Sequence, residues 1–177
     1  MCVNIKPQDV LVVLKILASG WPGSFASLGQ QLGMSASEAH AAFHRARRAG
    51  LINPSSEQPN KSAVAEFVIH ALKYVLAVRP GGRTRGMLTG FAAAPLAASF
   101  HASASDTDLP VWPDPEGEAA GLDIRPIFRS ATGAARRDPR LYEWLVLADA
   151  LRGAGRFRER ELAEKFVRQL LVYHATG

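Results

Sequence analysis

The sequence predicts a mainly α-helical protein, and three observations support this fold class. Apolar residues recur three and four positions apart over much of the chain, which is the spacing of one helix face. Two short helical segments near the N-terminus are separated by the turn residues Gly33 and Met34. Residues 138–177 contain two further apolar stripes separated by glycines, which predicts a C-terminal helical hairpin.

The first helix is expected from Pro7 to Ala18. Proline suits the first helical turn, because its missing N–H would have no partner there. The residues that form its inward stripe are Val10, Leu11, Leu14 and Leu17. Residues 19–23 (SGWPG) then break the helix, and Ser24 is placed to cap the next one.

The segment from Ser24 to Ile52 predicts a helix-turn-helix. Gly33 can end its first helix in the left-handed conformation. Ser35 and Glu38 have the spacing of a capping box, in which each side chain accepts a hydrogen bond from the other residue's backbone amide. The second helix then runs to Gly50, and its expected core residues are Ala39, Phe43 and Ala46.

The opposite face of the second helix is polar and ends in arginines. A helix of about four turns suits the major groove of DNA, which is about 12 Å wide. Small polar side chains and imidazoles can contact base edges, whereas arginines reach phosphates or guanine. The residues assigned to the groove are Ser35, Ser37, His40, Ala41 and His44, with Arg45, Arg47 and Arg48 assigned to phosphates or guanine; Ser35 has the alternative role of a cap alone.

The stretch LGQQLGMSASEAHAAFHRARRAGLI resembles the recognition half of bacterial winged-helix transcription regulators of the MarR-like kind. The matching positions are Leu28, Leu32, Gly33, Ser35, Ser37, Ala39, Gly50 and Leu51. The resemblance covers about the first half of the chain, and it implies a DNA-binding unit of three helices followed by a two-stranded hairpin wing. The same unit also serves in protein contacts and in antitoxins.

The chain after the second helix does not have the pattern of such a wing. Residues 53–61 (NPSSEQPNK) contain two prolines and no alternating apolar run, so the wing is expected to be reduced or absent. An amphipathic helix is predicted next, from about Ser62 to Ala77. Its expected inward residues are Val64, Phe67, Val68, Ala71, Leu72 and Val75.

Residues 79–90 (RPGGRTRGMLTG) combine four glycines with three arginines and predict a mobile cationic loop. Such a loop can replace a wing, with Arg83 and Arg85 contacting DNA phosphates or the minor groove. A solvated linker is the alternative interpretation. The spacing of a nucleotide-binding P-loop is missing.

Residues 91–123 are rich in small residues, prolines and acids, and little regular structure is expected there. Trp112 is the large apolar residue of this segment. A short extended stretch around it is expected to dock on the helical body, or to pair with Ile124 to Phe128. A strip that binds a protein partner is the alternative.

The predicted hairpin begins at Asp138 and Pro139, and its second helix runs from about Arg158 to Tyr173. Its expected function is dimerisation or packing against the N-terminal unit. The chain is thereby divided into residues 1–78, a helix-turn-helix domain with a bracing helix; residues 79–137, the Gly/Arg loop and the Pro-rich acidic segment; and residues 138–177, the hairpin.

The formal net charge of +5 is distributed unevenly. The first 85 residues carry ten Lys/Arg against four Asp/Glu, whereas residues 86–124 carry six acids and no Lys or Arg. A basic front half favours a polyanionic partner. The single cysteine, Cys2, allows no internal disulfide, which is typical of a reducing cytoplasm, and no membrane span is apparent.

The chemistry-bearing residues do not form a catalytic pattern. Nucleophile elbows, zinc-protease motifs and dinucleotide fingerprints are all missing from the sequence. His40 and His44 have the i, i+4 spacing of a zinc pair, but the sequence assures no third ligand nearby. The sequence therefore predicts neither an enzyme, nor a metal site, nor a cofactor.

The function expected from these features is that of a cytoplasmic, sequence-specific DNA-binding regulator. It would act on double-stranded DNA as a homodimer, with residues 35–49 in the major groove. The alternative is an antitoxin or adaptor that binds a protein partner, with DNA binding secondary. An enzyme is the third possibility, and it would require His70 or His101 to converge with carboxylates that the sequence alone does not bring together.

Overall fold

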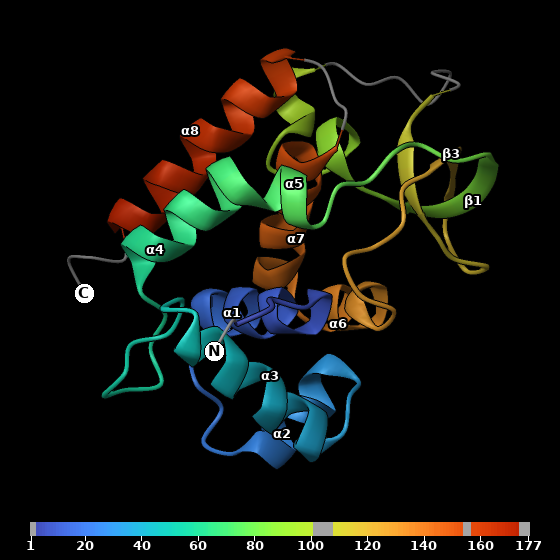
Figure 1. The fold of residues 1–177 in the computed structure, drawn as a ribbon. Coiled ribbons are helices and arrows are strands. Elements are labelled where there is room, and N and C mark those ends of the chain that lie inside the picture. Colours follow the sequence, from blue (N-terminus) through green and yellow to red (C-terminus); the bar gives the residue numbers. More distant parts are fainter. Residues whose placement is uncertain (1–2, 101–107, 154–156, 174–177) are drawn as a thin grey trace.

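The computed structural model describes residues 3–100, 108–153 and 157–173, and these are mostly helical with a small three-stranded sheet (Figure 1). The first three helices are α1 (Pro7–Ser19), α2 (Phe25–Leu32) and α3 (Ala36–Arg48). All three were predicted within two residues at each end. They pack on one another, and the expected core residues Ala39, Phe43 and Ala46 of α3 are buried.

The helix α1 lies between α3 and α7 (Pro139–Arg152), and it packs on both (Figure 1). Its central residues, from Val10 to Ile16, are therefore all buried, including the charged Lys15. One apolar cluster of described residues includes side chains from all three predicted segments of the chain. The division into domains at residues 78 and 137 stays a prediction.

After α3 the chain makes a single bridge in place of a two-stranded hairpin. Ile52 faces Pro59 across this bridge, the Asn53 amide donates to the Gln58 carbonyl at 2.9 Å, and the Asn60 amide donates to the Leu51 carbonyl at 2.9 Å. Pro59 has no backbone N–H to donate, so the hydrogen bonds of a regular two-stranded hairpin cannot continue past this bridge.

The helix predicted from Ser62 to Ala77 is present, but it changes its winding in the middle. It consists of α4 (Lys61–Glu66), a π-helical turn (Phe67–Ala71) and α5 (Leu72–Val75). A π turn holds more residues than an α turn, so the residues beyond it rotate relative to simple helical spacing. This rotation corrects the prediction for Val75, which is 47% exposed, while Ile69 is buried instead.

Residues 79–90 are not the predicted mobile loop, because Arg83–Leu88 form strand β1. This glycine-rich stretch can form a strand because Gly86 has no side chain at a point where the neighbouring strand comes very close. A Cβ on Gly86 would lie 1.9 Å from the carbonyl oxygen of Trp112 on the neighbouring strand. The glycine therefore allows a close approach between two backbones rather than flexibility.

The segment 91–123 is also more regular than predicted, because it contains β2 (Pro110–Pro113) and β3 (Ala119–Asp123). Strand β1 pairs antiparallel with both, in the registers Leu88 to Val111 and Gly86 to Ala119, and β2 pairs with β3 in parallel. The three strands thus close on one another. Residues 101–107, part of the same prediction, lie outside the described residues.

Trp112 docks on the helical body as expected, and only 1% of it is exposed. Its indole N–H donates to Asp149 at 2.6 Å, and the Thr89 hydroxyl donates to the same carboxylate oxygen at 2.7 Å. Arg152 donates to the other oxygen at 2.8 Å. A buried carboxylate satisfied in this way fixes the sheet on the helix that carries it.

The C-terminal hairpin is formed by α7 (Pro139–Arg152) and α8 (Phe157–Tyr173), and it confirms the predicted pair of helices. Residues 154–156, which include most of the predicted glycine linker, lie outside the described residues. Consecutive residues from Trp144 to Arg152 are all buried, so α7 is surrounded by the rest of the chain. The short helix α6 (Ala131–Arg137) precedes α7 and was not predicted.

None of the helices in the described ranges is both long and apolar enough to cross a membrane.

Candidate nucleic-acid interface

The α2–α3 turn is built from two glycines with different roles. Gly33 ends α2 with φ +68°, in the left-handed region, and the Met34 amide turns back to the Gly29 carbonyl at 2.9 Å. A Cβ on Gly29 would lie 2.6 Å from the Met34 carbonyl oxygen. The tight turn therefore requires glycine at both positions, one for its dihedral angles and one for space.

The start of α3 has the capping box that the sequence predicts. The Glu38 amide donates to the Ser35 hydroxyl at 3.1 Å, and the Ser35 amide donates to the Glu38 carboxylate at 3.0 Å. Hydrogen bonds from the Ser35 backbone amide and side chain, together with the nearby Arg129, hold the pKa of Glu38 below its usual value. Glu38 thus stays ionised at neutral pH at the end of α3 where a negative charge stabilises the helix.

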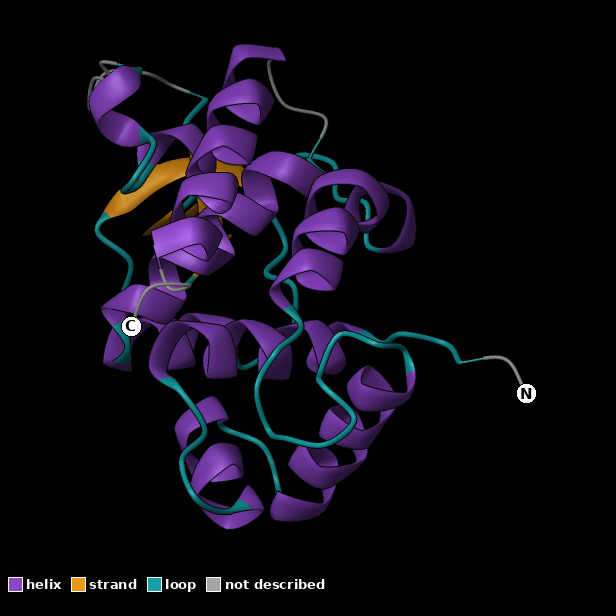
Figure 2. Ribbon diagram, turned by 90° about the vertical axis from the view of Figure 1, so that its left-hand side faces the viewer, coloured by secondary structure: helices purple, strands orange, loops and turns teal. Residues whose placement is uncertain are grey.

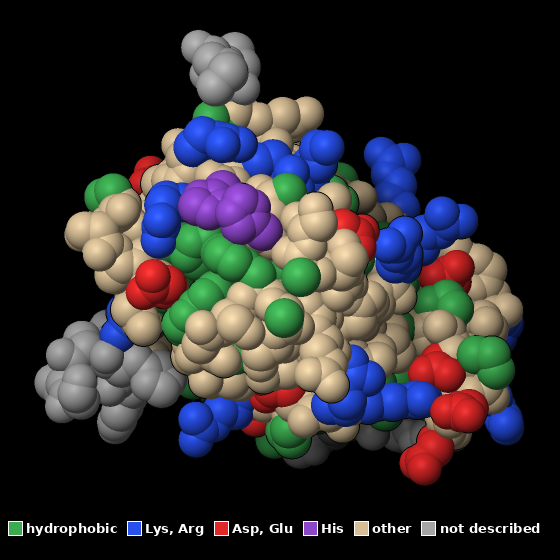
Figure 3. All heavy atoms as spheres, turned by 90° about the horizontal axis from the view of Figure 1, so that it is seen from below, with side chains coloured by type: hydrophobic (Ala, Val, Ile, Leu, Met, Phe, Trp, Pro, Cys, Tyr) green, Lys and Arg blue, Asp and Glu red, His purple; other side chains and the backbone are tan. Residues whose placement is uncertain are grey.

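The outward face of α3 carries the polar residues that the sequence assigned to a groove. Ser35, Ser37 and His40 are exposed, and Ala41 and His44 are half-buried. Figure 3 shows this end of the molecule from below, with histidine side chains against hydrophobic ones and Lys and Arg side chains around them.

The two histidines belong to an aromatic group that fixes their position. The His40 and His44 ring centres are 4.3 Å apart, and the Phe25 ring of α2 lies 4.8 Å from His40. Burial, together with the charges of His40, Arg47 and Arg48, lowers the pKa of His44 from its usual value. At pH 7 His44 is therefore neutral and presents one hydrogen-bond donor and one acceptor.

The three arginines of α3 are not equivalent. Arg45 points to α1, where its Nε and Nη2 donate to the two carboxylate oxygens of Asp9 at 2.7 to 3.1 Å. Its side chain is 19% exposed, and that of Asp9 is completely buried. This buried pair fastens α3 to the start of α1, which gives Arg45 a structural role that its sequence position does not reveal.

Arg47 is held as well, because its guanidinium lies 4.7 Å from the Phe43 ring centre and donates to the Ser56 carbonyl at 2.8 Å. It joins α3 to the turn that follows it. Arg48, in contrast, is exposed at the C-terminal end of α3. Of the three arginines, Arg48 alone is exposed, so its guanidinium is accessible to a phosphate.

Arg83 and Arg85 are exposed on β1, but the structure does not bring them to α3. The strands lie beside the C-terminal helices, and α2 and α3 lie at the other end of the molecule (Figures 1 and 2). The fold therefore does not support a role for these two arginines as a substitute wing on the same face of the molecule as α3.

Arg129, which lies just before α6, was not among the residues predicted for the site. Its Nη2 is 3.1 Å from the Glu38 carboxylate. The signal available in the sequence was the spacing of Ala131, Ala134 and Ala135, which marks a short helix with a small buried face. The same segment brings Arg137 to α2, where it donates to the Gln31 carbonyl at 3.1 Å.

No three potential ligands of a metal ion converge within the part of the chain that the structure describes. No protein-family model, no curated protein and no solved structure matches this chain.

Proposed function

We propose that this protein is a sequence-specific DNA-binding transcription regulator whose α3 lies in the major groove. The supporting observation is the combination of a tight α2–α3 turn, a capped α3 N-terminus, and an exposed polar face formed by Ser35, Ser37, His40 and Arg48. On this proposal α1 to α3 form a helix-turn-helix unit with a wing reduced to the Ile52–Pro59 bridge.

The proposed contacts follow from the side chains that remain available. Ser37, His40 and His44 face base edges, and Arg48 binds a phosphate or guanine. Arg45 and Arg47 support α3 from behind, since both have protein partners. The protein would act in the cytoplasm as a homodimer, with two α3 helices about 34 Å apart in successive major grooves, so its operator would be an inverted repeat.

The experiment is selection of binding sites from random duplex DNA, followed by titration of the enriched sequence with wild type, His40→Ala and Arg48→Ala. We expect His40→Ala to reduce discrimination against wrong bases and Arg48→Ala to reduce the salt slope by about one. Arg168→Ala on α8, where Arg168 pairs with Glu164, is the matched control. Recovery of no enriched sequence would overturn the proposal.

A role as an antitoxin or adaptor is the second candidate, and one observation favours it. Tyr74 and Val75 are adjacent on α5 and are 79% and 47% exposed, so two consecutive large side chains are available there to a protein partner. The acidic segment gives no such support, because its Trp112 is buried within the chain. Isolation from native cells as a stoichiometric complex with one other protein, without selective DNA binding, would favour this candidate.

A further inference from the structure

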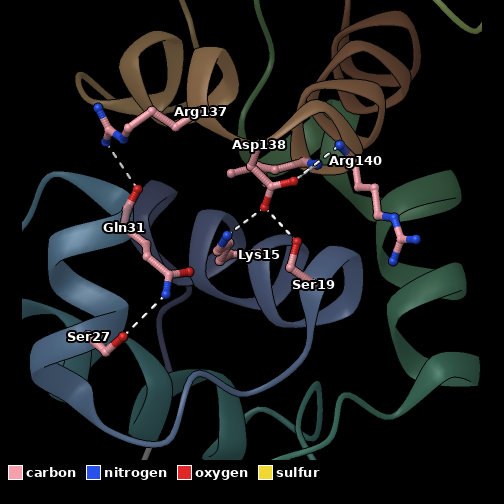
Figure 4. A network of polar contacts seen from close by, with 8 residues as sticks. Lys15, Ser19, Ser27, Gln31, Arg137, Asp138 and Arg140 are labelled. Carbon is pink, nitrogen blue, oxygen red and sulfur yellow. Dashed lines mark hydrogen bonds and ion pairs between the residues drawn. The ribbon is translucent and has the colours of Figure 1, made fainter.

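Residues 128–137 lie directly against the turn between α2 and α3. A Cβ on Gly33 would lie 3.2 Å from the Cβ of Ser130, so the Ser130 side chain packs closely against Gly33. Arg129 extends from here to Glu38 at the N-terminal end of α3. Arg137, at the end of α6, reaches the Gln31 carbonyl in the last turn of α2. Figure 4 shows Arg137 above Gln31, next to the joint between α1 and α7.

Arg129 is held less firmly than Arg45 on α3 and Arg136 on α6, and Arg137 is exposed. Arg45 is paired with a completely buried carboxylate. Arg136 is shared between Asp114 at 2.6 Å and Glu116 at 3.0 Å. The Arg129 side chain, in contrast, is 72% exposed, and that of its partner Glu38 is 38% exposed. Exposed ion pairs of this kind contribute little, so a phosphate can replace the carboxylate.

We propose that Arg129 and Arg137 form a second phosphate-binding edge of the DNA interface, next to the α2–α3 turn. This inference rests on the proposed function. Arg48 lies ten residues beyond Glu38, which corresponds to about 15 Å along a helix that rises 1.5 Å per residue. Cationic side chains thus flank α3 at both ends. When α3 enters a groove of duplex DNA, the sugar-phosphate backbone on each side of that groove can contact one of these side chains.

The pair between Arg129 and Glu38 has a consequence for affinity. In the free protein Glu38 partly neutralises Arg129, and it places a negative charge at the edge that would meet phosphate. Removal of this charge should therefore strengthen DNA binding, whereas removal of Arg129 should weaken it. Glutamine serves in a capping box as glutamate does, so Glu38→Gln keeps the start of α3 intact.

The test is fluorescence anisotropy with a labelled duplex of about 30 bp and random sequence, titrated at several salt concentrations. Each lost phosphate contact should lower the salt slope by about 0.9 and weaken binding about eightfold at about 0.1 M salt. We expect this for Arg129→Ala and for Arg137→Ala, and about twice the change in slope for the double variant. Arg129→Lys keeps the charge and should retain most of the affinity, and Arg168→Ala on α8 should bind as wild type does.

The outcomes separate the inference from the function on which it rests. If Arg48→Ala weakens binding while Arg129→Ala and Arg137→Ala leave affinity and salt slope unchanged, the second edge is wrong and α3 still binds DNA. If Glu38→Gln and Arg129→Ala both weaken binding, their pair only supports α3, and the inference is again overturned. If wild-type protein binds no duplex at low salt, both the function and the inference fail.

Discussion

Asp138 joins α1 to α7, because each oxygen of its carboxylate accepts hydrogen bonds from one of the two helices. Its Oδ1 caps α7 by accepting from the amides of Arg140 and Leu141, both at 3.1 Å. Its Oδ2 accepts from Lys15 at 2.5 Å and from the Ser19 hydroxyl at 2.6 Å, both on α1 (Figure 4). Lys15 and Asp138 are distant in sequence, and their side chains are only 7% and 12% exposed.

Asp138→Asn should destabilise the protein by about 3 kcal/mol, because it leaves the ammonium of Lys15 buried without a counter-charge. Asparagine is also a good N-cap, so the loss will not come from the start of α7. Ser19→Ala is the control, because it removes only a neutral donor and should cost about 1 kcal/mol. Urea unfolding measures the free energy of unfolding of both variants. Equal losses in the two would contradict the role assigned to the ion pair.

The same carboxylate should make stability depend on acid pH. Burial alone would raise the pKa of Asp138, but hydrogen bonds from Lys15, Ser19 and the Leu141 amide outweigh it and hold the pKa below the usual 3.8. The stability from the ionised form is therefore complete above about pH 3.8 and is lost as the pH falls through the folded-state pKa. We expect the wild-type free energy of unfolding to decline more steeply than that of Asp138→Asn between about pH 4 and pH 2. Parallel curves would contradict this.

Arg45 and Arg48 should separate stability from DNA binding, although they are three residues apart on one helix. Arg45→Ala leaves the completely buried Asp9 without its partner and should cost about 3 to 5 kcal/mol of stability. Arg48→Ala removes an exposed side chain and should change stability by less than about 0.5 kcal/mol while weakening DNA binding. Thermal unfolding and anisotropy on the same samples make the comparison, which fails if Arg45→Ala unfolds as wild type does.

Gly29→Ala should strain the α2–α3 turn, because the new Cβ would lie 2.6 Å from a backbone oxygen that cannot move independently. We expect a loss of about 1 to 3 kcal/mol, the usual cost of overpacking. Gly82→Ala is a matched control, since a Cβ there meets no atom within 4 Å. Denaturant unfolding of the two variants is sufficient, and a stable Gly29→Ala protein would show that the turn is looser than described.

His44 should make stability fall on mild acidification. Burial and the charges of His40, Arg47 and Arg48 hold its pKa below 6.5 in the folded protein. The unfolded chain then binds a proton more readily, so stability is complete above about pH 6.5 and decreases as the pH falls toward the folded-state pKa. His44→Gln should show a flatter profile between about pH 7 and pH 5 in thermal unfolding. An unchanged profile would mean that other groups carry the dependence.

The sequence alone determined the local parts of this protein. Helices α1, α2, α3, α7 and α8 were predicted because apolar periodicity, caps and glycine stops are signals within a few residues of each other. The capping box of Ser35 and Glu38 is such a signal, and it is present as predicted. The burial of Trp112 was also predictable, because a single large aromatic residue in a polar segment has much to gain from docking.

Only the tertiary structure decided which arginines support the fold and which face solvent. The three arginines of α3 follow the same sequence pattern. Arg45 binds Asp9, Arg47 binds Ser56, and Arg48 is exposed to solvent. No local spacing in the sequence specifies these differences. The closed three-stranded sheet likewise depends on the approach of Gly86 to the Trp112 backbone, a contact between distant segments. Local signals specify elements because helix formation is local, whereas the partners of a charge or a strand depend on how those elements pack.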